Sequence, residues 1–445
     1  MEDKAIKTVK VGICGLGTVG SGVLKILSSN ADIIASRAMK IEVARVAEKD
    51  FARAKDLLDR AGLSSVPISG DWHELVNDEN IDIIVEVIGG IKVAKDIITA
   101  ALQAGKSVVT ANKDLMAAFG GEMLHLAEEN HTDLFFEASV AGGIPVIQAV
   151  KESLSGNRIL QVMGIVNGTT NYILSNMTEQ GSSFKAALKE AQELGYAEAD
   201  PTNDVEGYDA ARKIAILASI VFNSRVNDSM VATEGITNIS SWDIAYAKEF
   251  GYVIKMVGIA RCDGQSIEVR VHPLMISKDH PLASVRDSYN AVFVEGDAVE
   301  KTMFYGRGAG SLPTGSAIVG DIINAARNIN HNCKSRWGCT CYKQLPIKPL
   351  AETISKYFVR LNVCDRPGVF AAITNILSEE SVSMATVMQK RRTGGGEAEI
   401  VLITHLTPHA AIEKAISRVV DLDCVFAATS IIRVEDNEEQ FTQEL

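Results

Sequence analysis

The sequence lacks three features that would place the protein at a membrane, on nucleic acid or outside the cell. No uninterrupted apolar run approaches the roughly 20 residues that a membrane-spanning helix needs. No basic stripe offsets the formal net charge of −12, which argues against a nucleic-acid partner. The first residues, Met1-Glu2-Asp3-Lys4, do not follow the charged-then-apolar plan of a secretory signal. We therefore expect a cytoplasmic protein with no membrane and no nucleic-acid partner.

Cysteine is sparse and its distribution is irregular. Seven cysteines, an odd number, are scattered over 445 residues, which is typical of reduced thiols and not of a disulfide framework. Cys333, Cys339 and Cys341 do cluster, but the only histidine nearby is His331, and zinc normally takes four ligands. We favour a loop with incidental thiols over a metal site and leave the role of the three cysteines open.

The composition that remains is that of an ordinary globular protein. Hydrophobic residues make up 47% of the chain and charged residues 22%. A chain of 445 residues is too long for one core, so two or three domains are expected.

A glycine motif near the start predicts a nucleotide site. A short apolar strand over 8–14 is followed by Gly15-Leu16-Gly17-Thr18-Val19-Gly20 and then by a helical pattern. In this context Gly15 permits the tight turn, Gly17 lets a pyrophosphate approach the backbone, and Gly20 lets helix and strand pack closely. The helix N-terminus adds N–H donors for the phosphates.

Strand and helix patterns continue to alternate up to residue 110. Strands are expected at 41–47, 81–88 and 107–110, with helices at 51–60 and about 93–104. This order predicts an α/β, doubly wound parallel sheet of the Rossmann type, with ligands at the carboxyl ends of the strands. Thr110 and Lys113 lie at one such end, so we expect both at the cofactor cleft.

The residues after the second strand leave the cofactor undecided. An acidic residue at this place favours the free 2′-hydroxyl of NAD, whereas a basic one suits the 2′-phosphate of NADP. Glu48 and Lys49 are adjacent, and Arg53 follows one turn later. NAD and NADP both remain open.

An acidic stretch that ends in Asp209 and is followed by Lys213 predicts a site of proton transfer. Asp209 and Lys213 are four residues apart, so on a helix they share one face. The next residues, 214–221, are almost all apolar, which indicates a buried helix with the pair at the edge of a core cleft. A carboxylate beside a lysine can handle protons where water is excluded. We favour this interpretation over an exposed salt bridge.

A loop of small polar residues, Asn167-Gly168-Thr169-Thr170-Asn171, opens another predicted helix after the strand at 159–166. Its N–H groups and Thr169 suit a carboxylate ligand, although a plain N-cap explains the loop equally well.

Together these segments resemble homoserine dehydrogenase. The resemblance covers roughly residues 8–330, and the block at 195–213 carries it most specifically. The matching segments are 15–20, Thr-Ala-Asn-Lys at 110–113, Glu-Ala-Ser-Val-Ala-Gly-Gly-Ile-Pro at 137–145, Asn-Gly-Thr-Thr-Asn-Tyr-Ile-Leu at 167–174, Gly-Tyr-Ala-Glu-Ala-Asp-Pro at 195–201, Asp-Ala-Ala-Arg-Lys at 209–213, Gly-Arg-Gly-Ala-Gly at 306–310 and Pro313-Thr314.

The resemblance implies a reaction and a role for each residue. The reaction is reversible hydride transfer between a nicotinamide cofactor and aspartate 4-semialdehyde, giving L-homoserine. Lys213 would be the general acid held by Asp209, with Lys113 as a second cation near the reacting oxygen. For the substrate the resemblance implies an ammonium site of Glu198 and Asp204, beside a polar end shaped by Tyr196, Gly168 and Thr169.

The resemblance also implies a monovalent cation, Na⁺ or K⁺, beside the turn at Glu137. The Glu137 carboxylate and the backbone carbonyls of Val140, Gly142 and Ile144 would be its ligands. A glutamate that caps backbone N–H groups explains the same residues equally well.

The last part of the chain predicts a regulatory domain. After an aperiodic linker at 331–350, the pattern over 351–435 reads βαββαβ, a ferredoxin-like fold. The loop with Asp365, Gly368 and Val369 resembles that of an ACT domain, which implies an amino-acid effector, here L-threonine. A purely structural dimerisation role is the alternative. Residues 436–445 form an acidic tail, expected to be disordered.

These parts give one predicted organisation. Residues 1–136 and 305–330 form the nucleotide domain, and residues 137–304 an α+β substrate and dimerisation domain. We expect a monofunctional enzyme without a fused kinase domain, assembled as a homodimer or homotetramer. A non-catalytic nucleotide and amino-acid sensor is the alternative, and it would tolerate loss of Lys213 or Asp209, both of which are present.

Overall fold

The computed structural model describes residues 8–37, 39–336, 338–391 and 396–436. These residues form two compact units, each built from separate stretches of chain. The first unit takes the residues up to Val166, then Arg212–Val231 and Tyr289–Leu345, and the second takes Asn167–Ala211, Ala232–Ser288 and the residues from Pro346 onward.

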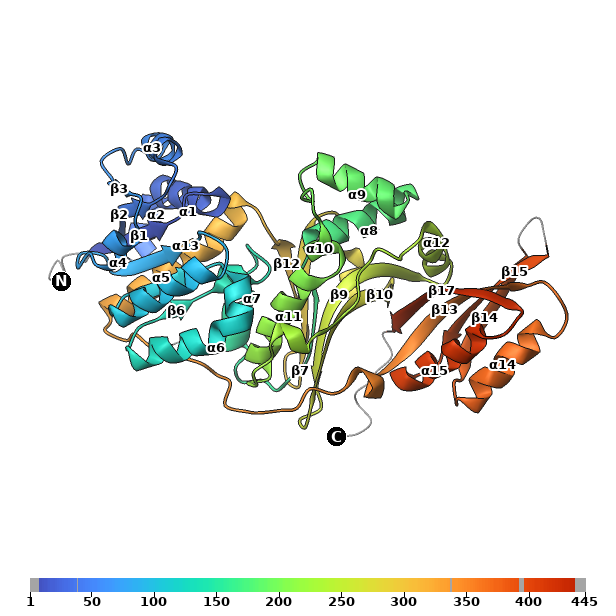
Figure 1. Cartoon of the computed structure of the whole chain (residues 1–445). Coiled ribbons are helices and arrows are strands. Elements are labelled where there is room, and N and C mark those ends of the chain that lie inside the picture. Colours follow the sequence, from blue (N-terminus) through green and yellow to red (C-terminus); the bar gives the residue numbers. More distant parts are fainter. Residues whose placement is uncertain (1–7, 38, 337, 392–395, 437–445) are drawn as a thin grey trace. The chain divides into compact units, whose positions relative to one another are not determined.

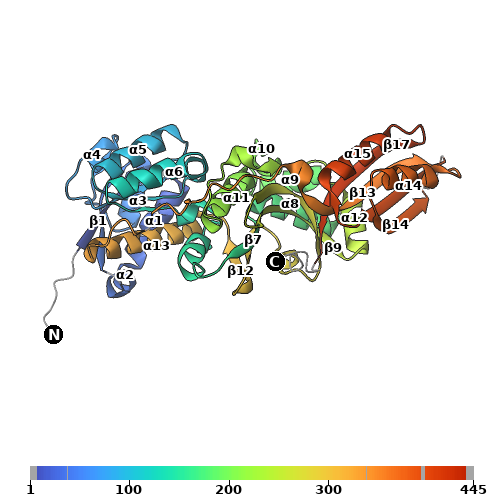
Figure 2. The same ribbon diagram turned by 90° about the horizontal axis from the view of Figure 1, so that it is seen from below.

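The first unit contains the predicted parallel sheet. Its strand order is β3-β2-β1-β4-β5-β6 and all its neighbours are parallel, which confirms a doubly wound α/β fold. Helices cover both faces, with α4, α5 and α6 on one and α1, α2 and α13 on the other (Figure 2). The strands are β1 Thr8–Cys14, β2 Lys40–Ala47, β3 Ile68–Ser69, β4 Ile83–Glu86, β5 Ser107–Thr110 and β6 Leu134–Phe135. The helices are α1 Thr18–Ser29, α2 Ala31–Arg37, α3 Phe51–Arg60, α4 His73–Val76, α5 Lys92–Gln103, α6 Lys113–Glu129 and α13 Ser311–Asn330.

Helix α13 comes from much later in the chain and packs on α1 (Figure 1). The two helices touch through glycine: a Cβ on Gly22 would lie 2.1 Å from the Ser311 carbonyl oxygen, and one on Gly315 would lie 2.8 Å from the Gly22 carbonyl carbon. Small residues at both positions therefore set the close approach of these helices.

The rest of the first unit is a three-stranded antiparallel sheet with irregular helices before it. Strand β11 (Tyr289–Gly296) lies between β12 (Glu300–Arg307) and β7 (Ile159–Ile165). Before β7 the chain forms a short α-helical turn, α7 (Val146–Gln148), that widens into the π-helix η2 (Ala149–Ser153). The shift from i→i+4 to i→i+5 bonding ends α7 after one turn. The 3₁₀ turns η1 Glu137–Ser139 and η3 Asp228–Met230 also belong to this unit.

The second unit begins with helices and a long hairpin. Strands β9 (Tyr252–Cys262) and β10 (Ile267–Ser277) pair antiparallel along their whole length, and β8 (Ala232–Thr233) adds to β10. The helices are α8 Gly168–Gln180, α9 Phe184–Glu193, α10 Thr202–Val205, α11 Tyr208–Val221, whose later turns fall in the first unit, α12 Ser241–Glu249 and the 3₁₀ turn η4 Pro281–Ser284.

The C-terminal part of the second unit is the predicted βαββαβ fold, with strand order β17-β13-β15-β14 and antiparallel neighbours. Strand β17 also pairs with β10 in parallel, with Leu274 opposite Arg433, so this fold extends the sheet of the hairpin. The elements are η5 Leu350–Glu352, β13 Ile354–Cys364, α14 Val369–Glu379, β14 Met384–Arg391, β15 Glu397–Thr404, β16 Thr407–Pro408, α15 His409–Val420 and β17 Val425–Glu435.

The predicted linker and tail are only partly described. Among the described residues between α13 and η5 there is no helix or longer strand, as expected for a linker. Of the predicted acidic tail only Asp436 is described, and its carboxylate accepts hydrogen bonds from the Tyr252 hydroxyl and Lys356. Disorder is therefore wrong for Asp436, and residues 437–445 lie outside the described residues. In the described part of the chain, no helix is both long and apolar enough to span a bilayer.

Candidate active site

The glycine motif forms a tight loop between β1 and α1. Gly15 has φ +100°, in the region that favours glycine, and a Cβ there would lie 2.8 Å from the Val87 carbonyl oxygen. A Cβ on Gly20 would lie 2.1 Å from the Gly15 carbonyl oxygen. A Cβ on Gly17, by contrast, would meet no described atom within 4 Å. Gly15 and Gly20 therefore serve the loop itself, whereas Gly17 leaves its outer side open. Leu16, Thr18 and Val19 complete this loop and the start of α1.

Glu48, at the end of β2, is bonded to the glycine loop. Its carboxylate accepts from the N–H of Leu16 at 2.7 Å, of Lys49 at 2.8 Å and of Asp50 at 3.2 Å. Partial burial acts to raise the pKa of Glu48, but these backbone hydrogen bonds lower it overall. The side chains of Lys49 and Arg53 are exposed beside it. An acidic group and two cations thus lie at the place where a ribose is read in this fold.

Thr110 and Lys113 lie at the carboxyl end of β5, as predicted. The Thr110 hydroxyl donates to the fully buried Glu86 carboxylate at 2.7 Å and accepts from the Asn112 N–H at 3.0 Å. Burial raises the pKa of Glu86. Asn112 caps α6, whose first residue is Lys113. The Lys113 side chain is half-buried.

Helix α11 carries Asp209 in its first turn and Lys213 one turn later. Lys213 is only 9% exposed, and its Nζ donates to the Val166 carbonyl oxygen at 2.7 Å. Arg212, the residue before it, forms an ion pair with Asp114 at 3.2 Å, and Asp114 follows Lys113. This ion pair joins the start of α6 to α11, so the two helices that carry the predicted lysines are held together in the first unit.

A cluster of side chains in the second unit, which we call the carboxylate cluster, joins Asn167, Asp204 and Asp209. The Asn167 Nδ2 donates to Asp204 at 2.6 Å and to Asp209 at 2.9 Å. The Asn167 Oδ1 accepts from the Thr170 N–H at 2.9 Å and so caps α8. Asp209 is 4% exposed and Asn167 is 6% exposed. One asparagine thus starts a helix and fixes two carboxylates.

The remaining predicted substrate residues divide into two groups. Gly168 and Thr169 form the first turn of α8, and the Thr169 hydroxyl donates to the Tyr196 carbonyl oxygen at 2.7 Å. The Tyr196 ring is 41% exposed and packs against Tyr172. Glu198 is also exposed, and its backbone carbonyl, not its carboxylate, accepts from Gln192. The structure thus brings Thr169 and Tyr196 together and leaves the Glu198 carboxylate at the surface.

Comparison with known proteins finds matches along most of the chain. Family models match in three consecutive stretches: a homoserine dehydrogenase NAD-binding domain at 15–137, homoserine dehydrogenase at 145–323 and an ACT domain at 357–424. The chain is 42% identical to the homoserine dehydrogenase of Bacillus subtilis over 434 residues, which is 97% of this chain and 99% of that one.

The chain belongs to the homoserine dehydrogenase family. Members of this family are NAD(P)-dependent oxidoreductases that act on a CH–OH group, so the protein is an enzyme of amino-acid biosynthesis. A crystal structure of a homoserine dehydrogenase from Thiobacillus denitrificans is 42% identical, covers 97% of this chain and 99% of its own, and superposes with a TM-score of 0.90. A hyperthermophilic archaeal homoserine dehydrogenase in complex with NADPH is 27% identical and covers 72% of this chain and 98% of its own, with a TM-score of 0.61.

The turn predicted to hold a cation in this family member is built around Glu137. Its buried carboxylate accepts from the N–H of Ile147 at 2.8 Å and of Gln148 at 2.7 Å, which are the free donors at the start of α7. The Ile144 carbonyl oxygen accepts from the Val146 N–H. Burial raises the pKa of Glu137 to about 7. Glu137 therefore acts as a helix cap, and the Val140 and Gly142 carbonyls belong to the same turn.

The predicted effector loop lies between β13 and α14. Gly368 has φ +90° and precedes α14, while Asp365 is exposed and its N–H donates to the Gly396 carbonyl oxygen. The Val369 side chain is 5% exposed and belongs to the core of the ACT domain. A ligand in this loop would therefore meet the Val369 backbone and not its side chain.

Sequence reasoning missed two buried groups of the second unit. Asn167 was considered only as part of a polar loop, and its link to two carboxylates depends on Asp204 and Asp209, 37 and 42 residues away. Arg360 was not considered at all. It is 5% exposed and donates to Asp243 at 2.9 Å, Glu399 at 3.0 Å and Ser240 at 3.1 Å. Charged residues within an apolar strand pattern, as at Arg360, were the available signal.

Proposed function

We propose that Lys213 is the general acid and base of the homoserine dehydrogenase reaction, with Asp209 as its partner and Lys113 as a second cation. The observation that carries this is the burial of Lys213 on the same helix as a buried carboxylate that Asn167 fixes. A bound nicotinamide cofactor would supply or accept the hydride. When an aldehyde is reduced its oxygen gains negative charge, and a buried ammonium group can stabilise this oxygen and protonate it.

The substrate side of the proposal uses the carboxylate cluster. Asp204, fixed by Asn167, would bind the substrate ammonium, and the first turn of α8 at Gly168 and Thr169 would face the polar end of the substrate together with Tyr196. Glu198 would join them only if its exposed side chain turns toward the ligand. L-Homoserine and L-aspartate 4-semialdehyde carry the ammonium and carboxylate groups that such a site needs.

The test is turnover with L-homoserine, followed at the absorbance of reduced nicotinamide, for the wild type and Lys213→Ala. We expect the variant to lose about 10²–10⁴-fold in kcat, the usual range for a general acid or base. Lys255→Met is the matched control, because Lys255 is also buried and donates to Asn171 and Val285 within the protein. Its loss should lower stability but keep kcat. Equal losses in both variants would contradict the role of Lys213.

We further propose that NADP is the preferred cofactor, with NAD as the alternative. Glu48 is engaged by three backbone N–H groups, which leaves Lys49 and Arg53 as the exposed charges beside it. The archaeal relative with NADPH gives the same indication. Lys49→Glu should move the ratio of kcat/KM values toward NAD, whereas Lys55→Glu, on the same helix as Arg53, should leave the ratio unchanged.

For regulation we propose L-threonine as a feedback inhibitor that binds near Asp365 and Gly368. The support is the physical link from the ACT sheet to the catalytic part: Arg360 on β13 is bonded to Asp243 on α12, and β17 pairs with β10. Asp365→Ala should retain turnover and lose inhibition by threonine. Full inhibition of this variant, or none of the wild type, would leave the domain a structural or dimerisation role.

The cation and the assembly stay predictions as well. A Na⁺ or K⁺ ion on Glu137, Val140, Gly142 and Ile144 would make activity depend on the monovalent ion, so replacing it by choline is the test. Analytical ultracentrifugation tests the expected homodimer or homotetramer. A cytoplasmic location is likewise proposed from the sequence and awaits fractionation of cells.

A further inference from the structure

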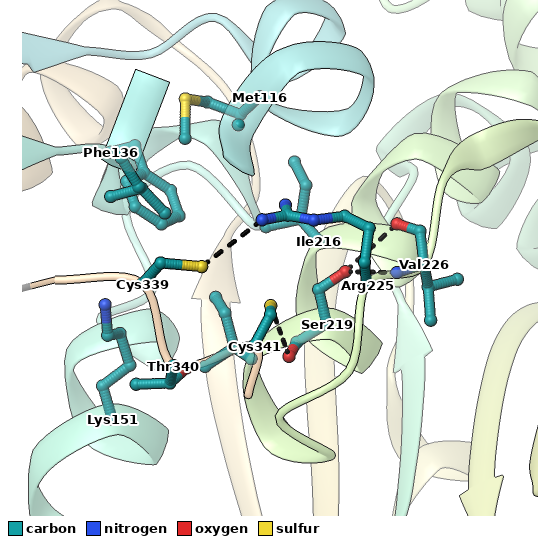
Figure 3. Close-up of a pocket in the computed structure, with 13 residues that line it drawn as sticks. Met116, Phe136, Lys151, Ile216, Ser219, Arg225, Val226, Cys339, Thr340 and Cys341 are labelled. Atoms are coloured by element: carbon teal, nitrogen blue, oxygen red, sulfur yellow. Dashed lines mark hydrogen bonds between the residues drawn. The ribbon is translucent and has the colours of Figure 1, made fainter. Parts of the chain in front are cut away.

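Two of the clustered cysteines lie in a pocket that the dehydrogenase reaction does not use. Cys339 and Cys341 belong to the loop after α13, and they face a cavity of about 30 Å³ within the first unit. Figure 3 shows Cys339 beside the Arg225 guanidinium and Cys341 beside Ser219. The other walls come from α6, with Met116, Gly120 and Leu124, and from α11, with Ile216 and Ile220. We call this the dithiol pocket.

The Arg225 guanidinium is in hydrogen-bond contact with one of the two sulfurs, that of Cys339. The Arg225 Nη2 donates to the Cys339 Sγ at 3.4 Å (Figure 3). The guanidinium fits there because α6 has glycine at position 121: a Cβ on Gly121 would lie 2.0 Å from this same Nη2. The neighbouring Gly120 is different, since its Cβ would meet Met116 at 3.2 Å and Arg225 only at 3.8 Å. Gly121 thus provides the space for the Arg225–Cys339 contact.

A second cation lies on the other side of Cys339. Lys151 lines the same pocket, and its Nζ donates to the carbonyl oxygen of Gly338 at 3.3 Å. It belongs to the π-helix η2, a local distortion that is frequent at functional sites. Low-pKa thiols occur beside such cations.

The surroundings shift the pKa values of the two thiols in opposite directions. The neighbouring Cys341, with the charges of Arg225 and Lys151, outweighs burial and holds the pKa of Cys339 well below its ordinary value. Its neighbour Cys339 and burial raise the pKa of Cys341, whose Sγ donates to the Ser219 carbonyl oxygen at 3.5 Å. Cys339 is therefore the sulfur that loses its proton more readily, and Cys341 the one that keeps it. Cys14 is the opposite case, since burial raises its pKa to about 12.

A reagent can reach the thiolate from outside. An open groove of about 450 Å³ is lined by Cys339, Gly338 and Thr340 and by the charged residues Lys151, Glu152 and Arg336. Cys339 thus lies between the inner pocket and solvent. Metal binding is not favoured, because no group of three or more His, Cys, Asp or Glu residues in the described part of the chain could hold an ion.

We propose that Cys339 and Cys341 form a peroxide-sensitive dithiol, with Cys339 as the attacking sulfur and Cys341 as the resolving one. The Cys339 thiolate attacks one oxygen of a hydroperoxide, the O–O bond breaks, and the leaving oxygen takes up a proton as an alcohol or water. The product is a Cys339 sulfenic acid. The Cys341 sulfur then attacks the Cys339 sulfur, the S–O bond breaks, and the hydroxyl leaves as water with the Cys341 proton. The protein loses two hydrogens and the peroxide is reduced by two electrons.

The first experiment measures the reactivity of Cys339 in the full-length protein. The rate of alkylation by iodoacetamide is followed from about pH 5 to pH 8 by peptide mass spectrometry, and the exposed Cys333 serves as an internal control. Trypsin separates the two, because cleavage after Arg336 and Lys343 releases a peptide that contains only Cys339 and Cys341. We expect the alkylation rate of Cys339 to fall less toward low pH than that of Cys333. Parallel pH profiles for the two would overturn the proposal.

A matched pair of variants tests the cause. Gly121→Ala should displace the guanidinium without removing its charge and raise the pKa of Cys339. At pH values below that pKa, a rise of one unit lowers the thiolate fraction tenfold, so alkylation of Cys339 should slow about tenfold there. Gly120→Ala, on the same turn of α6, should leave the rate unchanged. Equal rates in both variants would contradict the role of Arg225.

The second experiment adds hydrogen peroxide. In the wild type the 337–343 peptide should lose two hydrogens and regain them with dithiothreitol. Cys341→Ser should instead accumulate a sulfenic acid that dimedone traps on Cys339, and Cys339→Ser should give neither product. Formation of a disulfide with Cys333, or no mass change at peroxide levels that oxidise Cys333, would overturn the proposal.

Discussion

The glycine loop and the carboxylate cluster, which we propose bind the cofactor and the substrate, are built in opposite ways. In the glycine loop, the backbone makes the shape: Gly20 lies so close to Gly15 that a Cβ would clash with its carbonyl oxygen. In the carboxylate cluster, side chains make the shape, because Asn167 holds Asp204 and Asp209 by hydrogen bonds across 37 and 42 residues. A backbone-built region depends on residues with little or no side chain, whereas a side-chain-built region depends on the chemistry of each partner.

The largest effect is expected from the carboxylate cluster. Asp209→Asn keeps the shape of the side chain but removes its negative charge one helical turn from Lys213, so we expect kcat to fall about 10²–10³-fold. The measurement is the homoserine assay across pH.

Asp200→Asn is the control for this prediction. Asp200 lies in the same acidic stretch but is exposed and bonded only locally, to Thr202. It should change kcat by no more than about twofold, as an ordinary surface substitution does. Similar losses at both positions would mean that the overall negative charge of the segment matters and that Asp209 has no specific role.

The sequence could predict the features that depend on local backbone geometry, but not those that depend on side chains distant in the chain. The spacing of Gly15, Gly17 and Gly20 after a strand predicts the nucleotide loop because local backbone geometry is enough to specify it. The βαββαβ order of the C-terminal domain was predicted from local periodicity and is confirmed. The contact of Arg360 with Asp243, 117 residues apart, could not be predicted, because tertiary packing alone brings them together. The π-helix η2 could not be predicted for a different, local reason: apolar periodicity does not distinguish i→i+4 from i→i+5 bonding.

The next largest effect is expected at Glu137, whose carboxylate accepts hydrogen bonds from backbone N–H groups. Its folded-state pKa of about 7 exceeds the ordinary value of 4.5, so the folded protein keeps a proton that the unfolded chain loses between these values. The stabilisation is complete below the unfolded pKa and is lost as pH rises through the folded pKa. We expect the free energy of unfolding of the wild type, relative to Glu137→Gln, to fall by about 3 kcal/mol from about pH 4.5 to pH 7.

Urea unfolding at several pH values measures this difference. The same series with Na⁺ or K⁺ in place of choline decides between the two explanations of the turn. A bound cation would keep the carboxylate ionised and abolish the pH dependence, whereas a simple helix cap would leave it unchanged. A pH-independent difference in choline would show that Glu137 titrates normally.

Two glycine variants test whether the backbone alone determines the shape of the glycine loop. Gly20→Ala forces a Cβ against the Gly15 carbonyl oxygen, so we expect the free energy of unfolding to fall by about 2 kcal/mol. Gly17→Ala meets open space in the structure and should change stability by no more than about 0.5 kcal/mol. It should nevertheless weaken cofactor binding about tenfold, because the pyrophosphate approaches the backbone at this position. Calorimetric titration with NADP and urea unfolding separate the two effects. Loss of stability in Gly17→Ala would show that both glycines serve the loop alone.

The smallest effect is expected from Asn167→Ala, which acts on a helix cap and on substrate binding together. Loss of the cap on α8 should cost about 1 kcal/mol of stability. Loss of the donor shared by Asp204 and Asp209 should raise the KM for L-homoserine about tenfold, which is a similar free energy. Ser183→Ala is the control, because Ser183 caps α9 by accepting from the Ala186 N–H and has no such carboxylate partners. It should lower stability without changing KM. If both variants raise KM equally, the carboxylate cluster is organised by helix packing and Asn167 is only a cap; if Asn167→Ala alone raises it, side-chain chemistry specifies the substrate site.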